Sequence, residues 1–323
     1  MFLKFFSFKI IVIPALMISL FSCSMPSEVK NNSSEIFVMD TMCSISTDSK
    51  QASAEVSSAL KDMNTAFDSC GEKGEAFRLN KKRSAKCSDY LCGLINDSMR
   101  LSAAYSDNVE ISSGAVTLLW KEAGKSLKLP KQSETKDALA SIGDNLICTD
   151  GNNISLSDGC KIDTGAFAKG YALDKCKDIL DKSKCKSAVI SMASSVLLYG
   201  EKSDGSDFNV QIRNPDGNGF LGTVNVKSCF LSTSGGYERF FTIDGKNYCH
   251  IIDLSTGYPS ESDLTSVTVF CQSGILSDYL STLIFIGGTK NINRFLSSDD
   301  FKVAAFDKNG KSYISRNLDF KAV

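Results

Sequence analysis

The chain has 323 residues, 42% of them hydrophobic, which is enough to bury a sizeable core. Its 36 basic residues are balanced by 37 acidic ones, so the formal net charge is −1. This balance argues against a surface that binds nucleic acid or anionic lipid through its overall charge.

The first residues of the chain form a targeting segment. Lys4 and Lys9 precede an apolar run over residues 10–21, which is too short for a comfortable transmembrane helix. The run ends in Leu-Phe-Ser-Cys, and this ending resembles a bacterial lipoprotein signal that is cleaved before Cys23. We therefore expect lipid on the Cys23 thiol; an ordinary cleaved signal peptide is the alternative.

This interpretation divides the chain into three parts. They are a signal peptide over residues 1–22, a lipidated cysteine with a flexible tether over residues 23–35, and one domain over residues 36–323. The mature protein is expected to be exported and anchored in a membrane. That membrane would be the bacterial inner membrane, with the protein facing the periplasm, or the cell surface.

The twelve cysteines are scattered singly, mostly within apolar patterns. The nearest spacing is from Cys87 to Cys92, so no Cys-x-x-Cys pair occurs. Removing Cys23 leaves an odd number. We interpret the remaining cysteines as mostly reduced and buried small hydrophobes, and we do not expect a zinc site.

Apolar spacing predicts a strand over residues 36–47 and helices over residues 52–67 and 88–105. A polar connection between the two helices contains residues 78–80, and Trp120, the only tryptophan, is expected in the core. The elements predicted next are a short helix over residues 134–142 and strands within residues 146–156.

Residues 161–174 predict a strand that ends at Asp163, a glycine bend, and a helix that begins near Ala168. Such a join offers free backbone amides and a helix dipole to an anion, with Lys169 beside them. It is neither a Walker loop nor a GxGxxG motif, and joins of this kind are common. Alone, it is therefore only weak evidence for a phosphate-binding site.

The rest of the chain is rich in predicted strands. They cover residues 188–192, 196–199, 208–213, 223–232, 301–306 and 312–316, and the last two form a terminal hairpin.

The only histidine, His250, follows a predicted hairpin whose turn is Asp244-Gly245. His250 and Asp253 therefore lie where a strand gives way to a Thr-Gly turn, a usual place for chemistry on a rigid support. The histidine either takes part in chemistry or is an ordinary packed or surface residue.

A helix over residues 276–287 is predicted to follow a strand over residues 265–271. Asp278, Ser281 and Thr282 are at positions i, i+3 and i+4, so they project from one helix face. Oxygen ligands of this kind suit a hard cation such as Mg²⁺. The alternative is an acid favoured by the helix dipole, with hydroxyls bonded back to the backbone.

In chain order, these pieces resemble the ApbE family of FAD:protein FMN transferases. The motifs that carry the resemblance are Met39-x-Thr41, the segment 110–120, Asp163-x-Gly165-Ala166-x-Ala168-Lys169-Gly170, Thr233-Ser234-Gly235, His250-Ile-Ile-Asp253-x-x-Thr256-Gly257-Tyr258-Pro259 and Asp278-x-x-Ser281-Thr282. The resemblance spans residues 36–316. It implies an α+β, T-fold-like architecture of antiparallel sheets with packed helices and a ligand cleft between two lobes.

The resemblance also assigns roles. The ligands of Mg²⁺ would be Asp278, Ser281 or Thr282, and the backbone carbonyl of Ala166. His250 would activate the acceptor hydroxyl as a general base whose ordinary pKa suits neutral pH. The flavin nucleotide would be contacted by Met39, Cys70, Asn108, Val109, Glu110, Asp163, Lys169 and Ile252.

The activity implied by the resemblance is Mg²⁺-dependent transfer of FMN from FAD to a threonine or serine hydroxyl of an exported acceptor protein, with release of AMP. Two alternatives remain open: an Mg²⁺-dependent FAD pyrophosphatase that gives FMN and AMP, and a non-catalytic FAD-binding lipoprotein.

Several positions depart from the family pattern. Cys70 stands where an aromatic residue usually faces the flavin, and Asp40 replaces the glycine of Met-Gly-Thr. Ala193-Ser194 stands in place of a Gly-Gly pair, and Leu254-Ser255 in place of Pro-Arg. These departures concern the flavin-stacking and loop positions, so FAD cleavage is better supported by the sequence than acceptor recognition.

Overall fold

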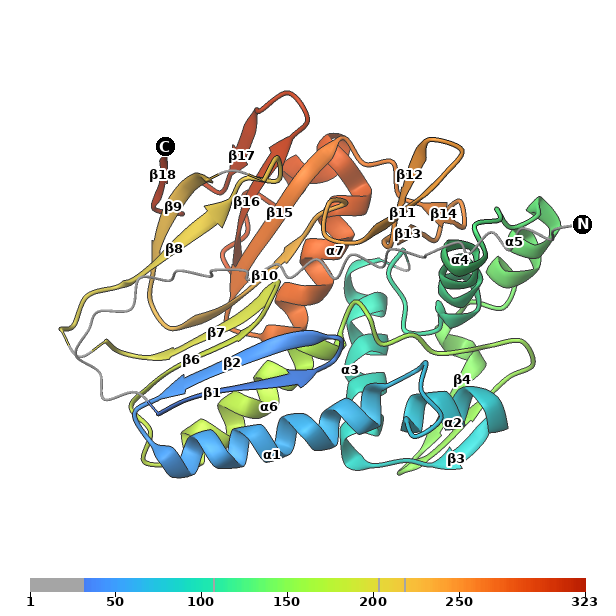
Figure 1. Ribbon diagram of the computed structural model, residues 1–323, viewed down its shortest axis with the longest axis horizontal. Helices are drawn as coiled ribbons and strands as arrows, with labels where there is room; N and C mark the ends of the chain where they lie inside the picture. The colour runs from blue at the N-terminus through green and yellow to red at the C-terminus, as the bar shows by residue number, and fades with distance from the viewer. Residues whose placement is uncertain (1–31, 107, 203, 218) are drawn as a thin grey trace, which may run out of the picture.

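An antiparallel sheet of eight strands runs through the computed structural model, which describes residues 32–106, 108–202, 204–217 and 219–323 (Figure 1). Its strands lie in the order β1 (Asn32–Val38), β2 (Thr41–Thr47), β6 (Ser187–Met192), β7 (Ser195–Gly200), β10 (Cys229–Ser234), β15 (Leu264–Cys271), β16 (Phe301–Asp307) and β17 (Ser312–Ile314).

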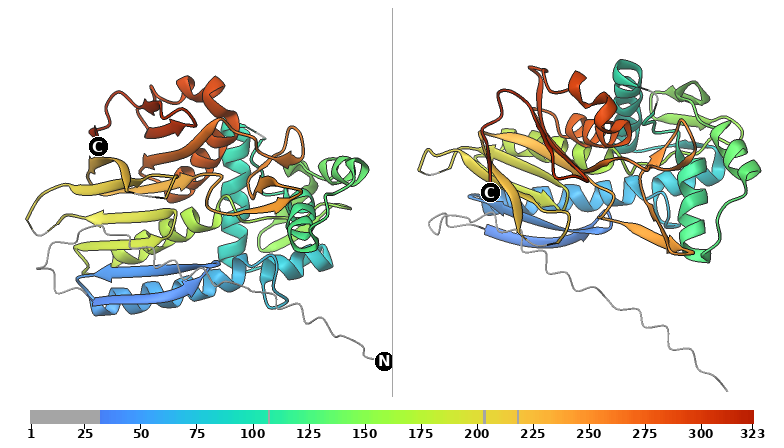
Figure 2. Two further views of the ribbon diagram at one scale, coloured as in Figure 1. Left: turned by 45° about the horizontal axis from the view of Figure 1, so that its top comes forward. Right: turned by 90° about the horizontal axis from the view of Figure 1, so that it is seen from above.

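Helices cover one face of this sheet (Figure 2). They are α1 (Lys50–Phe67), α6 (Ala168–Lys182) and α7 (Gly274–Asn291), and α3 (Asp89–Tyr105) packs against α1 and α7. Alternate residues of the strands, such as Ile45 and Ile190, are fully buried against them in the main core. The apolar stripe predicted for α1 is confirmed, because Val56, Leu60 and Met63 are also fully buried.

A smaller sheet covers part of the opposite face. It consists of β8 (Phe208–Arg213), β9 (Phe220–Val226) and β18 (Phe320–Ala322). Its side chains form a second core with residues of β7, β10, β15 and β16, including Leu198 and Phe270. At the other end of the main sheet, Phe37 of β1 and Met42 of β2 are 67% and 52% exposed.

Shorter elements gather beyond one end of the main sheet (Figure 1). They are α2 (Glu75–Lys82), β3 (Ser84–Lys86), α4 (Gly114–Ser126), α5 (Gln132–Leu139), η1 (Asp144–Leu146), β4 (Ile147–Asp150), β5 (Asn153–Leu156), β11 (Phe240–Ile243), β12 (Lys246–Cys249), β13 (Ile252–Asp253) and β14 (Tyr258–Pro259). The remaining element, η2 (Ile292–Arg294), follows α7. Trp120 is buried, as predicted, and its Nε1–H donates to the Gly257 carbonyl at 2.7 Å.

The structure corrects four predictions about elements. The strand predicted over residues 36–47 is the β1–β2 hairpin, because Met39 and Asp40 adopt left-handed φ angles of 50° and 56° and reverse the chain. Since β1 begins at Asn32, the last residues assigned to the tether belong to the sheet. Residues 78–80 lie in helix α2 rather than in a connection. The strand predicted over residues 223–232 is interrupted, and its parts belong to β9 and β10.

Helix α4, like α2, was not predicted, and one predicted strand is reduced to a bridge. Helix α4 contains Trp120, and its N-cap, Ser113, makes no side-chain capping bond. The segment that ends at Asp163 makes a single parallel bridge, from Lys161 to Ser113. The predicted helices around α1, α3 and α6 and the terminal β16–β17 hairpin are confirmed.

The burial predicted for most cysteines is confirmed. Cys70 and Cys148 are exposed and the other nine cysteines of the described residues are buried without a disulfide. Burial raises the pKa of Cys43 and of Cys229 to about 12, which keeps these thiols protonated. Cys23 lies outside the described residues. Among the described residues, no helix has both the length and the apolar character of a membrane span.

Candidate active site

A cavity of about 1690 Å³ opens between the main sheet and the elements beyond its end. All eight residues predicted to contact the flavin nucleotide line it, as do His250, Ala166 and Thr282. Asp278 and Ser281 are buried in α7 and are not part of its surface. The structure therefore brings the predicted residues together from segments that are far apart in the sequence.

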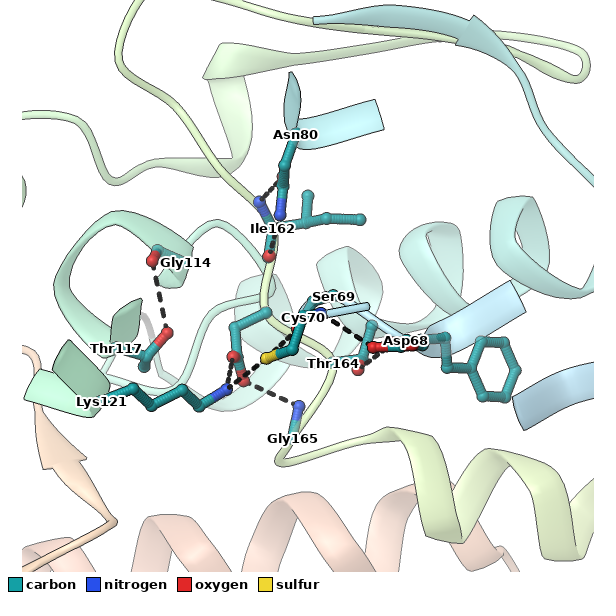
Figure 3. A network of polar contacts seen from close by, with 12 residues as sticks. Asp68, Ser69, Cys70, Asn80, Gly114, Thr117, Lys121, Ile162, Thr164 and Gly165 are labelled. Atoms are coloured by element: carbon teal, nitrogen blue, oxygen red, sulfur yellow. Dashed lines mark hydrogen bonds and ion pairs between the residues drawn. The ribbon is translucent and has the colours of Figure 1, made fainter. Parts of the chain in front are cut away.

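The wall at Asp163 is held by a polar network (Figure 3). Lys121 of α4 forms an ion pair with the Asp163 carboxylate at 2.8 Å, and the Gly165 backbone N–H donates to the same carboxylate at 2.9 Å. Burial opposes the ionisation of Asp163, but the charge of Lys121 and these hydrogen bonds outweigh it and lower the pKa of the carboxyl group. Asp163 is therefore a fixed anion in the cleft wall.

The backbone next to Asp163 is fixed by two further side chains. Asn80 of α2 binds both polar groups of Ile162, accepting from its N–H at 2.7 Å and donating to its carbonyl at 2.9 Å. The Thr164 hydroxyl donates to the Phe67 carbonyl at the end of α1 at 2.9 Å. These bonds leave the chain between Asp163 and α6 little freedom, so the cleft wall is pre-formed.

Lys169, in the first turn of α6, lies at the centre of the cleft. Its ammonium group donates to the Ser194 hydroxyl in the turn between β6 and β7. Asp278 of α7 lies nearby and accepts from the Gly170 N–H at 3.0 Å and from the Ser195 hydroxyl at 3.3 Å. Burial raises the pKa of the Asp278 carboxyl group, and the positive charge of Lys169 opposes this rise.

Two hydroxyls predicted as metal ligands are bonded within α7. Ser281 and Thr282 donate to the Asp278 carbonyl at 3.0 and 3.2 Å, and both hydroxyls lie within hydrogen-bond distance of the Ser234 hydroxyl. The alternative drawn from the sequence, hydroxyls bonded back to the backbone, therefore describes these contacts. Thr282 nevertheless lines the cleft, as does Ala166.

The oxygen atoms around Asp278 match the chemistry of a hard cation. In the described part of the chain, no three His, Cys, Asp or Glu side chains are grouped so as to hold a metal ion. The protein ligands of a cation here would therefore be one carboxylate together with hydroxyl and carbonyl oxygens. Mg²⁺ binds such oxygen ligands and completes its coordination with water. A bound cation would favour the ionised form of Asp278 and so oppose the effect of its burial.

His250 immediately follows β12, and its ring is accessible from the cleft. The ring Nδ1 is 3.0 Å from the carbonyl oxygen of Arg239. Because a carbonyl oxygen can only accept, Nδ1 carries the proton and Nε2 keeps its lone pair.

The protein around His250 makes its ring a weak base. Desolvation lowers its pKa to about 4, and the nearby positive charges of Arg239 and Lys169 act in the same direction. The expectation of an ordinary pKa is therefore wrong, and the ring is neutral at pH 7.

Asp253 has a local structural role. Its carboxylate accepts from the Ser255 N–H and hydroxyl at 2.9 and 2.7 Å, and its carbonyl accepts from the Thr256 and Gly257 N–H groups. These bonds build the turn that follows His250, and Asp253 does not line the cleft. Cys70 does line it, with its Sγ 4.0 Å from the Lys121 ammonium group.

Sequence reasoning missed several charged residues of the cleft, among them Lys121, Glu238 and Arg239. Arg239 donates to the Asp40 carbonyl at 3.0 Å and so joins the β1–β2 turn to the loop before β11. Burial raises the pKa of Glu238. Lys121 directly follows the segment 110–120, which carries part of the family resemblance. No local sequence pattern distinguishes Glu238 or Arg239.

The comparisons with known proteins agree with the quoted motifs. The model of the ApbE family matches residues 39–306. The FAD:protein FMN transferase of Treponema pallidum is 27% identical over 298 residues, which cover 83% of this chain and 82% of that protein. A protein of the same name from Klebsiella pneumoniae is 28% identical over 202 residues, covering 61% of this chain and 62% of its own.

Solved structures share the fold. The ApbE protein of Thermotoga maritima superposes with a TM-score of 0.81 at 24% identity, covering 89% of this chain and 97% of that one. The flavin transferase ApbE of Vibrio cholerae gives a TM-score of 0.76 at 22% identity, also covering 89% and 97%. The predicted α+β arrangement of antiparallel sheets and packed helices is confirmed.

The ionisation of His250 can be measured directly, because this is the only histidine of the chain. An NMR titration of its imidazole signals is expected to give a pKa of about 4 rather than 6.5, with the proton on Nδ1 at neutral pH. Since the folded pKa lies below the unfolded one, this group contributes stability that is fully present above about pH 6.5 and is lost as the pH falls towards 4. A midpoint near 6.5 in the folded protein would contradict the described surroundings of the ring.

Proposed function

This chain belongs to the ApbE family, and we propose that it transfers FMN from FAD to a threonine or serine hydroxyl of an exported acceptor protein, releasing AMP. The observation that carries this proposal is one cavity that gathers His250, Lys169 and all the residues assigned to the flavin nucleotide. The FAD:protein FMN transferases named among its relatives support it.

The proposed reaction exchanges the phosphoanhydride bond of FAD for a phosphoester bond to the acceptor. The acceptor oxygen forms a bond to the phosphorus atom of the FMN half, and the bond from that phosphorus to the bridging oxygen breaks, so AMP leaves with the bridging oxygen. The acceptor hydroxyl loses its proton in this step. The lone pair on Nε2 of His250 receives it, since Nδ1 already donates to the Arg239 carbonyl.

The diphosphate is expected beside Lys169 and Arg239. Both cations are close enough to His250 to lower its pKa, so an anion attracted to them lies within reach of the base. The positive charge stabilises the negative charge that shifts onto the departing AMP. Asp163 is paired with Lys121, so neither of these two charges is left free to repel or attract the diphosphate.

A magnesium ion is part of the proposal. Its ligands would be the Asp278 carboxylate, the Thr282 or Ser281 hydroxyl and the Ala166 carbonyl. When bound, it neutralises phosphate charge and so makes the phosphorus easier to attack.

FAD hydrolysis is the second candidate. Cys70 lines the cavity at a position where the family pattern has an aromatic residue. The cysteine side chain is smaller than an aromatic ring. A flavin held more loosely there would admit water in place of the acceptor hydroxyl. The products would then be free FMN and AMP.

An assay with FAD, Mg²⁺ and an extract of exported proteins separates the candidates. Protein-linked flavin fluorescence indicates transfer, free FMN with AMP indicates hydrolysis, and the absence of both indicates binding alone.

His250→Ala should lower the transfer rate by ~10²–10⁴-fold, the usual contribution of a general base, with little change in FAD affinity. His250→Asn is the matched control for structure, because its amide can donate to the Arg239 carbonyl but cannot accept the proton. Full transfer activity in His250→Asn would remove the base from the mechanism.

Asp278→Asn tests the metal. It keeps an oxygen acceptor for the Gly170 N–H, whereas alanine would leave that buried donor unsatisfied at a cost of about 1–3 kcal/mol. The melting temperature of the wild type should rise with Mg²⁺ concentration, and that of Asp278→Asn should not. FAD cleavage should fall by at least ~10²-fold. The control, Glu238→Gln, changes a cleft carboxylate outside the ligand set; an equal response of both variants to Mg²⁺ would exclude the site.

We also propose that Cys23 carries the lipid that anchors the exported protein. Cys23→Ala should leave the precursor unprocessed or release the protein from membranes, as judged by fractionation and gel mobility. A matched control is Ser24→Ala, one residue further along the chain. A fully processed Cys23→Ala protein that remains with the membrane would show that the anchor lies elsewhere.

A further inference from the structure

We infer that Ser194 and Ser195, in the turn between β6 and β7, keep Lys169 and Asp278 from forming an ion pair with each other. The cation thereby stays available to the diphosphate, and the carboxylate stays available to a metal ion. Both serines are positioning residues, because they act through these two charged groups. The inference rests on the proposed function, since it concerns how the same site is kept ready for its ligands.

Consecutive residues of one turn hold the two opposite charges. The Ser194 hydroxyl accepts from the Lys169 ammonium group. The Ser195 hydroxyl donates to Oδ1 of Asp278 at 3.3 Å, and the Gly170 N–H donates to Oδ2 at 3.0 Å. Ser194 is buried and Ser195 is fully buried, so water has little access to compete for these bonds.

Lys169 is close to two carboxylates and pairs with neither. Its positive charge opposes the rise that burial causes in the pKa of Asp278, and it acts on the pKa of Glu238 in the same direction. Among the ion pairs of the described residues, however, none involves Lys169. Lys121 of the same cleft does pair directly, with Asp163 at 2.8 Å. A direct ion pair is therefore possible in this cleft, and at Lys169 a serine takes its place.

A hydroxyl satisfies a charged group without cancelling its charge. The ammonium group of a lysine has three donors, and the bond from Lys169 to Ser194 uses one of them, which leaves the others for phosphate oxygens. A carboxylate has about four acceptor sites, so the bonds from Gly170 and Ser195 leave part of Asp278 for a metal ion. An ion pair would instead join two charges that attract strongly away from bulk water, and a ligand would have to break it.

The turn is fixed by its neighbours. Met192 and Ser195 are paired across it. The Ser194 carbonyl accepts from the Thr233 N–H in the neighbouring strand β10 at 2.8 Å. Ala193 takes a left-handed φ of 54°, which is less favourable for an alanine than for a glycine. The family pattern has two glycines at positions 193 and 194, and a glycine offers no hydroxyl, so this arrangement is a property of this chain's own sequence.

The test compares Mg²⁺ binding by the wild type and a set of variants in the absence of FAD. Ser194→Ala and Ser195→Ala each remove one hydroxyl, Ser194→Thr keeps a hydroxyl, and Ala193→Gly changes the same turn but leaves both serines. Lys169→Met removes the cation, alone and combined with Ser194→Ala. The Mg²⁺ affinity is obtained from the rise of the melting temperature with Mg²⁺ concentration.

Ser194→Ala and Ser195→Ala should each weaken Mg²⁺ binding by ~10–100-fold, the usual effect of losing a group that orients a metal ligand. The reason is that Lys169 then pairs with Asp278. Adding Lys169→Met to Ser194→Ala should restore at least the wild-type affinity, since no cation is left to pair, and this coupling is one that a purely structural role of the serine would not produce. Ser194→Thr and Ala193→Gly should bind Mg²⁺ as the wild type does.

Crystal structures of the wild type and of Ser194→Ala give a measurement that does not depend on Mg²⁺. In the wild type, the Lys169 ammonium group is expected on the Ser194 hydroxyl. In the variant, it is expected within ~4 Å of the Asp278 carboxylate, the distance of an ion pair. If Mg²⁺ leaves the melting temperature of the wild type unchanged, these two structures decide the inference.

Four results would overturn the inference. They are undiminished Mg²⁺ affinity in Ser194→Ala or Ser195→Ala, failure of Lys169→Met to restore the affinity, a lysine that does not move to Asp278 in the Ser194→Ala crystal, and equal weakening by Ala193→Gly, which would assign the effect to the shape of the turn. The proposed function is decided separately by the transfer assay, because none of these measurements uses FAD or an acceptor.

Discussion

The contact between α6 and α7 is the constraint on which the rest of the site depends. A Cβ on Gly170 would lie 2.2 Å from the Gly274 carbonyl oxygen, so the two helices can approach this closely only because both residues are glycine. The Asp174 carboxylate of α6 accepts from the Gly274 and Ile275 N–H groups and so caps the start of α7. The same approach lets the Gly170 N–H reach Asp278. The crossing therefore places the cation Lys169 and the buried carboxylate Asp278 side by side.

The cleft wall near Asp163 is built by different means. The chain near Asp163 pairs with another segment at only one β-bridge. Side-chain contacts take the place of further strand hydrogen bonds, because Asn80 binds the backbone of Ile162 and Lys121 forms an ion pair with Asp163. His250 belongs to neither wall, because it follows the β11–β12 hairpin and is tied to the Arg239 carbonyl across that hairpin's base.

The parts of the site that the sequence predicted are those fixed by local rules. The Asp244-Gly245 turn takes left-handed φ angles of 49° and 77°, as an Asp-Gly hairpin requires, and this positions His250. The spacing of Asp278 and Thr282 follows from the helix period. What could not be predicted depends on long-range pairing: Lys121 meets Asp163 across 42 residues, and Arg239 meets Asp40 across 199. The β1–β2 turn was missed for a local reason, since Met39 and Asp40 lack the glycine or asparagine that normally marks left-handed backbone.

Overall charge says little about this cleft. The chain has a formal net charge of −1, and the cleft is lined by acidic side chains as well as by lysines and arginines. What matters is how they are paired. Asp163 is neutralised by Lys121, and this removes one anion and one cation from the field that a ligand meets. Lys169 donates to a serine, and Arg239 to a backbone carbonyl, so neither of these bonds neutralises its charge. Both charges lie near His250, where they add to the desolvation that lowers the pKa of that ring, and an anionic diphosphate would be attracted to the same cations.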